Sequence, residues 1–358
     1  SSSIAPATRR AADEKVTFAG YDNENGYQFE GLSDLDENDR TRFAAQLVWT
    51  LSDAGHIGPF KVKADGSNLV EGMDTVSVDD FADYNPKVNS NSLSTLYALN
   101  EGNVLEVDSG VAEPVKGSLG SSGNVQSVDV TESGMIAAVS RKPSGDFKLQ
   151  MGEIGAALQD SVEGKTLARP TFEYNGQAVW TVVDGDRIVR VVRSKTTGRI
   201  SESEVDARSI DDIEGEISVI RLSHSGARAA MIIDGHVYIA AVAQSSSGDK
   251  RIVNAREVGP EVSGSALSLD WNNDGSLIVG TSSGQSPVWR IEQDGSSAST
   301  MPTGNITAPV VAVATSPSKL YITDSHAMLE LPATVVDEVN WREVPGLQGR
   351  RSSPIVSS

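Results

Sequence analysis

The sequence predicts a mainly β protein: a β-propeller of about six blades, preceded by a small α+β unit. Three observations predict this fold. A strand–turn–strand template recurs through the second part of the chain, and its turns return about every 42 to 50 residues. The two ends of that part carry complementary pieces of one blade. A period of this length is typical of propeller blades and not of helical solenoids.

The clearest copy of the template runs from Ile217 to Ala240. Alternating apolar residues lead to a turn at Ser225-Gly226, run back to a second turn at Asp234-Gly235, and continue into a third strand at Val237–Ile239. Turns that contain glycine, placed between β-branched runs, are typical of an antiparallel meander. The other copies begin at Val125, Thr171, Leu267 and Val311.

The N-terminal part has a different pattern. Residues 1–15 are expected to be disordered or frayed, and residues 16–75 to form the α+β unit. Its helix is predicted from Asp36, a good N-cap, to Leu51, with an apolar face that packs on a sheet. The strands are predicted at Val16–Ala19, Tyr27–Phe29, Ile57–Val62 and Asn68–Val70.

Residues 76–93 lose this periodicity and are interpreted as a linker, to which Val76 and Phe81 add apolar anchors. The propeller then occupies residues 94–358. Leu96–Val107 resembles the outer hairpin of a blade that lacks its inner strand, and Ser353–Val356 resembles an inner strand alone. If these two segments form one blade, they close the ring, and closure removes exposed edge strands.

Composition limits the possible functions. The chain has no cysteine, which excludes disulfides and cysteine zinc sites, and no apolar run long enough to cross a bilayer. A net charge of −19 argues against binding to nucleic acid or anionic lipid, and it indicates solubility or, less often, a basic partner. The first residues carry no secretion signal, so the protein is either cytoplasmic or begins after a removed leader.

Two motifs could carry chemistry, and each has a simpler interpretation. Asp270, Asn272, Asp274 and Gly275 match the start of a calcium-binding loop, but the twelfth position is Thr281 rather than Glu, and a turn is expected there anyway. Ser316 and Lys319 spell the S-x-x-K motif of acyl-serine enzymes, but they fall in a turn between strands where that motif needs a helix. The simpler interpretation is favoured for both.

Isolated histidines and tryptophans give no catalytic pattern. The histidines fall at turns or strand starts without metal-ligand spacing, and Ser223 and Ser225 point away from His224 if the three lie on a strand. Inter-blade packing is the favoured role of the tryptophans, with a binding surface as the alternative. The sequence therefore predicts no catalytic, cofactor-binding or metal-binding residue. The histidines are His56, His224, His236 and His326, and the tryptophans considered are Trp180, Trp271 and Trp289.

The segment Ala44–Leu51, AAQLVWTL, resembles the helix of the GerMN domain in the LpqB family of actinobacterial envelope lipoproteins. The repeats resemble the C-terminal propeller of that family in Gly176–Val182, Val219–Ser223, Gly226–Met231 and Asp234–Tyr238. The similarity covers most of the chain from about Val16 onward. Relative to the family, the GerMN unit of this sequence is truncated to its latter half.

The resemblance implies a longer protein with a secretion signal and a lipidated cysteine, held on the outer face of the plasma membrane, of which this chain is a soluble part. It also implies a non-enzymatic accessory role in signal transduction: binding to the extracellular domain of MtrB, the sensor histidine kinase of the MtrA–MtrB two-component system. Loops 140–147, 193–203, 243–250 and 293–307, taken as blade-joining loops, are the expected binding regions. The alternative is a propeller-based sensor of a cell-wall fragment or small solute.

Overall fold

The structure, a computed structural model, describes residues 16–84, 94–333 and 340–358, which divide into two compact units. Residues 16–84 and Ser225–Ala227 belong to the first unit, and the second contains the other described residues from 94 onward. The predicted frayed segment 1–15 and the part of the predicted linker from 85 to 93 lie outside the described residues. Among the described residues, no helix is both long and apolar enough to cross a membrane.

The first unit is one four-stranded sheet with a helix, as the sequence predicts. The strands follow the order β1-β2-β3-β4, and β2 pairs with β3 in parallel. Asp36 caps the helix, because its carboxylate accepts a hydrogen bond of 2.8 Å from the backbone N–H of Asp39. The elements are β1 (Thr17–Asp22), β2 (Gly26–Glu30), α2 (Glu37–Asp53), β3 (Val62–Ala64), β4 (Ser67–Asn68) and η1 (Val78–Tyr84).

The strand predicted at Ile57–Val62 lies further along the chain, at Val62–Ala64. Pro59 has no N–H to give to a strand ladder, and Phe60 pairs instead with Val76 through two backbone hydrogen bonds of 2.7 and 2.8 Å. Val76 and Phe81 are buried against α2 and the sheet, so the apolar anchors of the linker pack within the first unit.

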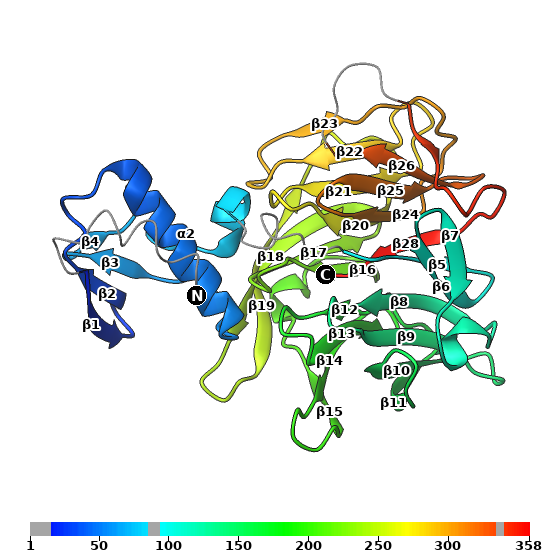
Figure 1. The fold of residues 1–358 in the computed structure, drawn as a ribbon, viewed down its shortest axis with the longest axis horizontal. Coiled ribbons are helices and arrows are strands. Elements are labelled where there is room, and N and C mark those ends of the chain that lie inside the picture. Colours follow the sequence, from blue (N-terminus) through cyan, green and yellow to red (C-terminus); the bar gives the residue numbers. More distant parts are fainter. Residues whose placement is uncertain (1–15, 85–93, 334–339) are drawn as a thin grey trace. The chain divides into compact units, whose positions relative to one another are not determined.

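The second unit is a propeller of six four-stranded blades, counted over the described residues. In each blade the strands follow one another from the inner strand to the outer one. Figure 1 shows the inner strands β8, β12, β16, β20, β24 and β28 around the centre of this unit, with outer strands such as β11, β15 and β23 at its periphery.

We number the blades in chain order. Blade 1 contains β28 (Ser353–Val356), β5 (Leu96–Asn100), β6 (Asn103–Asp108) and β7 (Val111–Pro114). Blade 2 contains β8 (Val125–Val130), β9 (Met135–Arg141), β10 (Phe147–Glu153) and β11 (Gln159–Gly164). Blade 3 contains β12 (Thr171–Phe172), β13 (Ala178–Val183), β14 (Arg187–Arg193) and β15 (Ile200–Glu204). The short helices η2 (Ser118–Gly120) and η3 (Arg208–Ile210) follow blades 1 and 3.

The remaining blades have the same build. Blade 4 contains β16 (Ile217–Leu222), β17 (Arg228–Ile233), β18 (His236–Gln244) and β19 (Lys250–Val258). Blade 5 contains β20 (Ala266–Trp271), β21 (Leu277–Thr281), β22 (Val288–Ile291) and β23 (Ala298–Thr300). Blade 6 contains β24 (Ala312–Thr315), β25 (Lys319–Thr323), β26 (Met328–Pro332) and β27 (Arg342–Glu343).

The predicted closure of the ring is confirmed. β28, from the C-terminal end of the chain, pairs antiparallel with β5, so that Ser353 lies opposite Leu99 and Val356 opposite Leu96. β28 also lies beside β24 of the preceding blade and β8 of the next one. The inner strands therefore form a complete circle, and β5 is not left as an unpaired edge strand.

Most of the loops predicted to join blades instead connect strands within a blade. Residues 142–146 join β9 to β10, 194–199 join β14 to β15, and 245–249 join β18 to β19, whereas the segment 293–307 does run from blade 5 toward blade 6. Because an antiparallel meander reverses at each turn, the hairpin after a second strand and the hairpin after a third strand lie at opposite ends of the blade. The four loops thus do not share one face.

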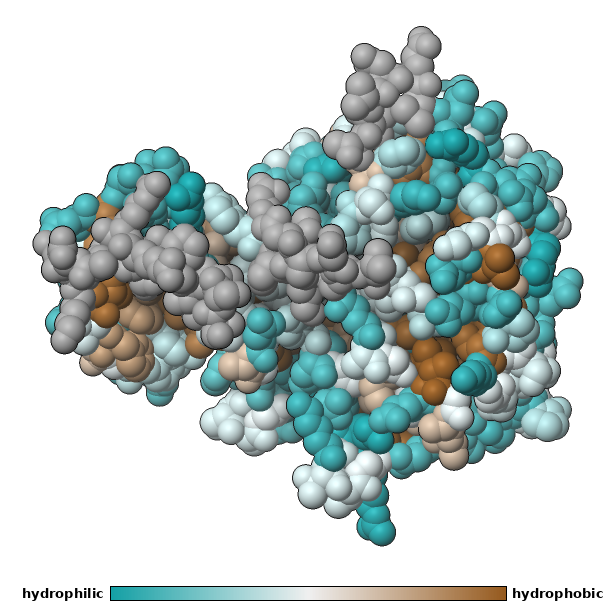
Figure 2. Space-filling view, in the orientation of Figure 1, coloured by the Kyte–Doolittle hydropathy of each residue, from teal (hydrophilic) through white to brown (hydrophobic). Residues whose placement is uncertain are grey.

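The visible surface of the propeller is mainly hydrophilic in Figure 2, and apolar residues show through in the gaps between loops. The apolar residues of the inner strands and their neighbours are buried in clusters shared by adjacent blades. Trp180 belongs to a buried cluster that includes Ile220 and Met231 of blade 4, and Trp271 belongs to one that includes Ala230 of blade 4. Inter-blade packing is thereby confirmed for these two tryptophans, while Trp289 is partly buried beside Trp271.

Candidate functional site

In the segment that resembles a calcium-binding loop, Asp270–Gly275, the carboxylates accept hydrogen bonds from groups of the protein itself. Asp270 accepts hydrogen bonds from the backbone N–H groups of Trp271 (2.9 Å) and Thr315 (3.1 Å). Asp274 accepts from Ser276 and pairs with the Arg290 guanidinium. Across residues 16–84, 94–333 and 340–358, no three His, Asp or Glu side chains are arranged to hold a metal ion. The segment is a hairpin turn between β20 and β21, in agreement with the simpler interpretation.

Ser316 and Lys319 also form a turn, between β24 and β25. The Ser316 hydroxyl accepts a 3.0 Å hydrogen bond from the backbone N–H of Lys319, while the Lys319 ammonium lies 3.2 Å from the Glu330 carboxylate. The ammonium is therefore engaged by a carboxylate, and no helix brings it beneath the hydroxyl as acyl-serine chemistry requires.

The four histidines lie where the sequence predicts, in turns or at a strand start. His236 begins β18, and its Nδ1 lies 3.0 Å from the exposed carboxylate of Glu257. His224 follows β16 in the turn toward β17, and the backbone N–H of His326 donates to Asp324. The structure brings none of the four, within the described ranges, into a three-residue group fit to hold a metal.

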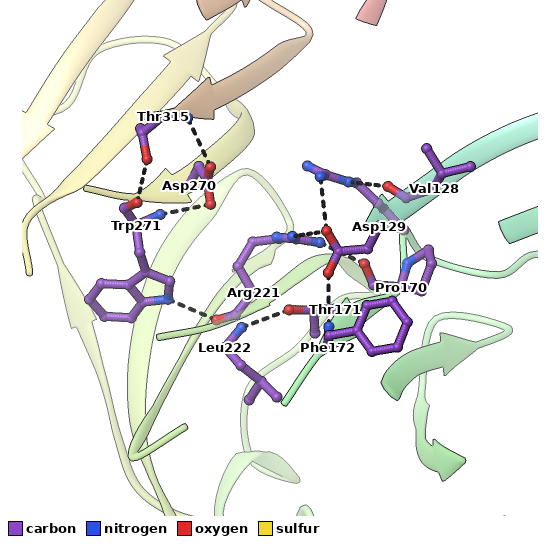
Figure 3. A network of polar contacts seen from close by, with 11 residues as sticks. Val128, Asp129, Pro170, Thr171, Phe172, Arg221, Leu222, Asp270, Trp271 and Thr315 are labelled. Carbon is purple, nitrogen blue, oxygen red and sulfur yellow. Dashed lines mark hydrogen bonds and ion pairs between the residues drawn. The ribbon is translucent and has the colours of Figure 1, made fainter. Parts of the chain in front are cut away.

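The strongest concentration of buried charge is in the centre of the propeller (Figure 3). The Asp129 carboxylate, on β8, receives the Arg221 guanidinium of β16 at 3.2 Å and that of Arg169 at 3.5 Å. Its second oxygen accepts a 2.8 Å hydrogen bond from the backbone N–H of Phe172. Asp129 is 2 % exposed and Arg221 7 %, so this ion pair is almost completely removed from water.

Backbone carbonyls also accept hydrogen bonds from the two arginines, while the buried Nε of Arg221 has no hydrogen-bond partner among the described residues. Arg221 donates to the carbonyl of Pro170 at 2.7 Å, and Arg169 donates to the carbonyl of Val128 at 2.9 Å. Burial and the adjacent charge of Arg221 lower the pKa of Arg169 to about 10, while the charge of Asp129 opposes this shift. Arg169 therefore remains charged at neutral pH, and the two guanidiniums are balanced by Asp129 and Asp270.

The same cluster contains a hydrogen bond that repeats from blade to blade. A side-chain oxygen of one inner strand accepts the backbone N–H of the next inner strand: Asp129 from Phe172, Thr171 from Leu222, and Asp270 from Thr315. Between blades 4 and 5 the Trp271 indole N–H donates instead to the carbonyl of Arg221 at 2.9 Å. We call Asp129, Thr171, Arg221 and Asp270 the channel belt. Its polar groups fasten neighbouring blades to one another.

The channel belt was not predicted, although the sequence carries a signal for it. Asp129, Arg221 and Asp270 each stand between two apolar residues, one position before the end of an inner strand. A charge that recurs at one position of a buried template indicates paired charges inside the ring, because isolated charges are too costly to bury. Arg169 precedes β12 and lies outside the template, so no repeat indicates it.

A second buried charge cluster lies between blades 3 and 4. Glu173 accepts hydrogen bonds from Arg190 at 2.6 and 3.1 Å and from the Trp180 indole at 2.8 Å. Burial alone raises the pKa of Glu173, but the hydrogen bonds and charge of Arg190, with the charge of Lys250, lower it below its ordinary value of 4.5. Burial also lowers the pKa of Lys250, which donates to Gln244 at 2.8 Å.

The lowered pKa of Glu173 predicts a specific acid sensitivity. The stabilisation is complete above the unfolded-state pKa near 4.5 and is lost as the pH falls through the lower folded-state value. We expect Glu173→Gln to lower the free energy of unfolding by about 3 kcal/mol at pH 7, because Arg190 loses its counter-charge. The difference from the wild type should shrink below pH 4.5, measured by urea unfolding from pH 3 to 8. Glu257→Gln, at an exposed pair, is the control, and equal losses in both variants would contradict the prediction.

Residues 102–357 match the family model described as the lipoprotein LpqB β-propeller domain, and this match identifies the family. This match covers blades 2 to 6 and all of blade 1 except β5. The chain belongs to the LpqB family. The family resemblance seen in the sequence is thereby confirmed, and so is the propeller fold.

Relatives in this family are similar along nearly the whole chain. Lipoprotein LpqB of Corynebacterium diphtheriae is 42 % identical over 363 residues, covering 99 % of this chain and 62 % of the relative. Lipoprotein LpqB of Mycobacterium tuberculosis is 30 % identical over 361 residues, covering 98 % of this chain and 60 % of the relative. The chain thus spans about three fifths of the length of these curated LpqB relatives.

One solved structure shares the fold at low sequence identity. A chain in the crystal structure of a nidogen/laminin complex has a TM-score of 0.55 and 10 % identity, covering 74 % of this chain and 99 % of that chain. At this identity the likeness concerns the arrangement of the blades alone and carries no information about partners.

Proposed function

We propose that this chain is the extracytoplasmic part of a lipid-anchored envelope protein without enzymatic activity. In this proposal it binds the extracellular domain of a sensor histidine kinase, MtrB of the MtrA–MtrB two-component system, and modulates its signalling. Membership of the LpqB family supports the envelope location, since the relatives are named as lipoproteins. The kinase is the partner that the family resemblance implies.

The proposal rests on one observation: the carboxylates of the channel belt are engaged by arginines and backbone N–H groups of the protein. Propeller enzymes and small-molecule binders need unsatisfied polar groups at the channel, where a substrate can reach them. Here Asp129 is occupied by two guanidiniums and a backbone N–H, and Asp270 by two backbone N–H groups. The channel belt thus favours a structural centre, and a ring fastened in this way supplies a rigid support for binding through its loops.

An exposed group of carboxylates suggests where a partner binds. The turn after β13, the segment before β16 and the turn after β17 meet at one end of blades 3 and 4. The three segments are in close contact. If Gly185 carried a Cβ atom, that atom would lie only 2.8 Å from the Cβ of Glu216, and a Cβ atom on Gly215 would lie 2.7 Å from the Cβ of Asp234. We call the exposed residues Asp184, Asp186, Asp212, Glu214, Glu216 and Asp234 the acidic sector.

The acidic sector fits a basic protein surface. Arg208, which lies nearby in sequence, is paired with Asp206 at 2.6 Å, so its charge is largely compensated. Exposed charges of one sign accelerate association with an oppositely charged surface and select against partners of like charge. The proposal therefore predicts association with the kinase domain that weakens as the salt concentration rises.

The test measures binding of the purified chain to the purified extracellular domain by sedimentation and by biolayer interferometry. We expect Asp212→Lys with Glu214→Lys to raise Kd by about tenfold or more, because both charges are reversed in the acidic sector. The control, Glu113→Lys with Glu204→Lys, makes the same change in net charge on the outer strands β7 and β15 and should leave Kd within about twofold. No association at several hundred micromolar, or equal weakening by both variants, would count against the proposal.

A further inference from the structure

An open groove lies between blades 1 and 2, away from the channel belt. Its volume is about 570 Å³, within the range of roughly 300–1,000 Å³ that is usual for small-molecule sites. It is lined by the β5–β6 turn, the start of β8 and the β9–β10 hairpin. The lining residues used below are Gly102, Gly123, Asn124, Gln126, Arg141 and Phe147.

One wall of the groove is bare backbone. Gly102 and Gly123 lie so close that a Cβ on Gly102 would be 2.2 Å from the carbonyl oxygen of Gly123, so no side chain fits there. The carbonyl of Gly102 accepts a 3.1 Å hydrogen bond from the backbone N–H of Val125, which fixes the wall. A bare wall of this kind lets a ligand approach peptide groups closely.

The lining of the groove also includes an arginine beside an aromatic ring. Arg141 and Phe147 are cross-strand partners in the β9–β10 hairpin, and the guanidinium carbon lies 5.9 Å from the centre of the phenylalanine ring. The backbone of Arg141 is tied to Asn124 by hydrogen bonds of 2.8 and 3.2 Å. An aromatic ring at this distance attracts the guanidinium, whose N–H groups can match the two oxygens of a carboxylate.

The charges of the groove favour an anion. Arg141 is exposed, and no ion pair or side-chain hydrogen bond joins its guanidinium to another of the described residues. The neighbouring Lys142 is neutralised by Glu163 at 2.7 Å. The lining includes no carboxylate, although the chain as a whole has a net charge of −19. Arg141 is therefore a cation without a counter-ion at the edge of a cavity of ligand size.

We propose that this groove binds the carboxylate of a small polar solute, with Arg141 as the carboxylate ligand. Phe147 holds the guanidinium in place, the amides of Gln126 and Asn124 are within the lining to contact the polar body, and the Gly102–Gly123 wall lets that body approach the backbone. The site is independent of the acidic sector and of the kinase, because it lies on other blades and selects ligands of the opposite charge.

The test uses two pairs of probes that differ in the carboxylate. N-acetylmuramic acid carries a lactyl carboxylate that N-acetylglucosamine lacks, and N-acetylalanine carries one that is an amide in N-acetylalaninamide. Binding to the whole chain is followed by the amide resonances of Gly102, Gly123 and Asn124, with each probe raised to about 10 mM. We expect shifts with at least one acid and none with its neutral partner. The acid that binds more tightly identifies the sugar or the peptide as the carrier.

Variants separate the specific contact from general charge. Arg141→Gln should weaken binding of the acid about tenfold or more, since it removes hydrogen bonds to a charged group. Arg141→Lys, which keeps the charge but not the planar fork, should give an intermediate loss. Arg187→Gln makes the same charge change in blade 3 and should leave binding unchanged. Arg141 is exposed, and unchanged thermal unfolding of each variant will confirm that the fold is intact.

The proposal fails if neither acid shifts these resonances, if the neutral probes bind as tightly as the acids, or if Arg141→Gln and Arg187→Gln have the same effect. None of these outcomes bears on the kinase proposal, whose test uses different residues. Likewise, a kinase domain that does not bind would leave the carboxylate site standing.

Discussion

Deletion of residues 353–358 is expected to abolish the native propeller, because it removes β28. Blade 1 then loses its inner strand, and β5 exposes its backbone groups from Leu96 to Leu99. The buried Ile355 and the contacts of β28 with β24 and β8 are lost at the same time. The loss should equal or exceed the ~5–15 kcal/mol that typically stabilises a domain, so that no cooperative unfolding transition remains.

The measurement is urea unfolding followed by circular dichroism and tryptophan fluorescence, with light scattering to detect association through the open edge. Two further experiments make the result specific. Ile355→Asp should destabilise the closed ring without deleting it, and addition of a peptide of residues 352–358 to the deletion variant should restore part of the native signal. A deletion variant that unfolds at the wild-type urea concentration would contradict the role of β28 in closure.

Asp129→Ala should be the most destabilising single substitution in the channel belt. It leaves the buried Arg221 guanidinium without its carboxylate and the N–H of Phe172 without its acceptor. Removal of one partner of a buried ion pair costs about 3–5 kcal/mol, since the remaining charge is uncompensated. Arg169 can shift toward water, because its side chain is 24 % exposed, so most of the loss should arise from Arg221.

The free energy of unfolding in urea measures this loss. Asp160→Ala, which removes an exposed ion pair with Lys148 in the same blade, is the matched control and should cost about 0–1 kcal/mol. The double variant Asp129→Ala with Arg221→Met removes both charges and should be more stable than Asp129→Ala alone. A loss below about 1 kcal/mol for Asp129→Ala would show that the ion pair does not stabilise the ring.

The sequence predicts the propeller because its inner three strands are apolar and separated by glycine turns. The fourth, outermost strand of each blade was not predicted. β15 and β27 are almost wholly exposed, and their residues are polar, so they carry neither alternation nor an apolar run. They become strands because the third strand of each blade has an unpaired edge with which they form backbone hydrogen bonds. Their strand conformation therefore depends on the neighbouring strand and not on their own sequence.

The same reason explains the strand misplaced in the first unit. Ile57–Val62 has strand-like composition, but Gly58 and Pro59 interrupt the ladder, and the partner of Phe60 is Val76, which lies outside the predicted unit. In the channel, the pairing of Asp129 with Arg221 joins residues 92 positions apart. The charged residue that recurs near the end of the inner strands indicates that buried ion pairs exist. Which of these charged residues contact one another is determined by the circular order of the blades.

The position of β28 in the chain also has a consequence for biosynthesis. The hydrogen bond from the N–H of Thr95 to the hydroxyl of Ser357 joins residues 262 positions apart. At a synthesis rate of about 5–20 residues per second, blade 1 therefore lacks its inner strand for roughly 13 to 52 seconds after Thr95 has been added. During this interval the nascent protein presents an unpaired strand edge at β5, to which a chaperone can bind.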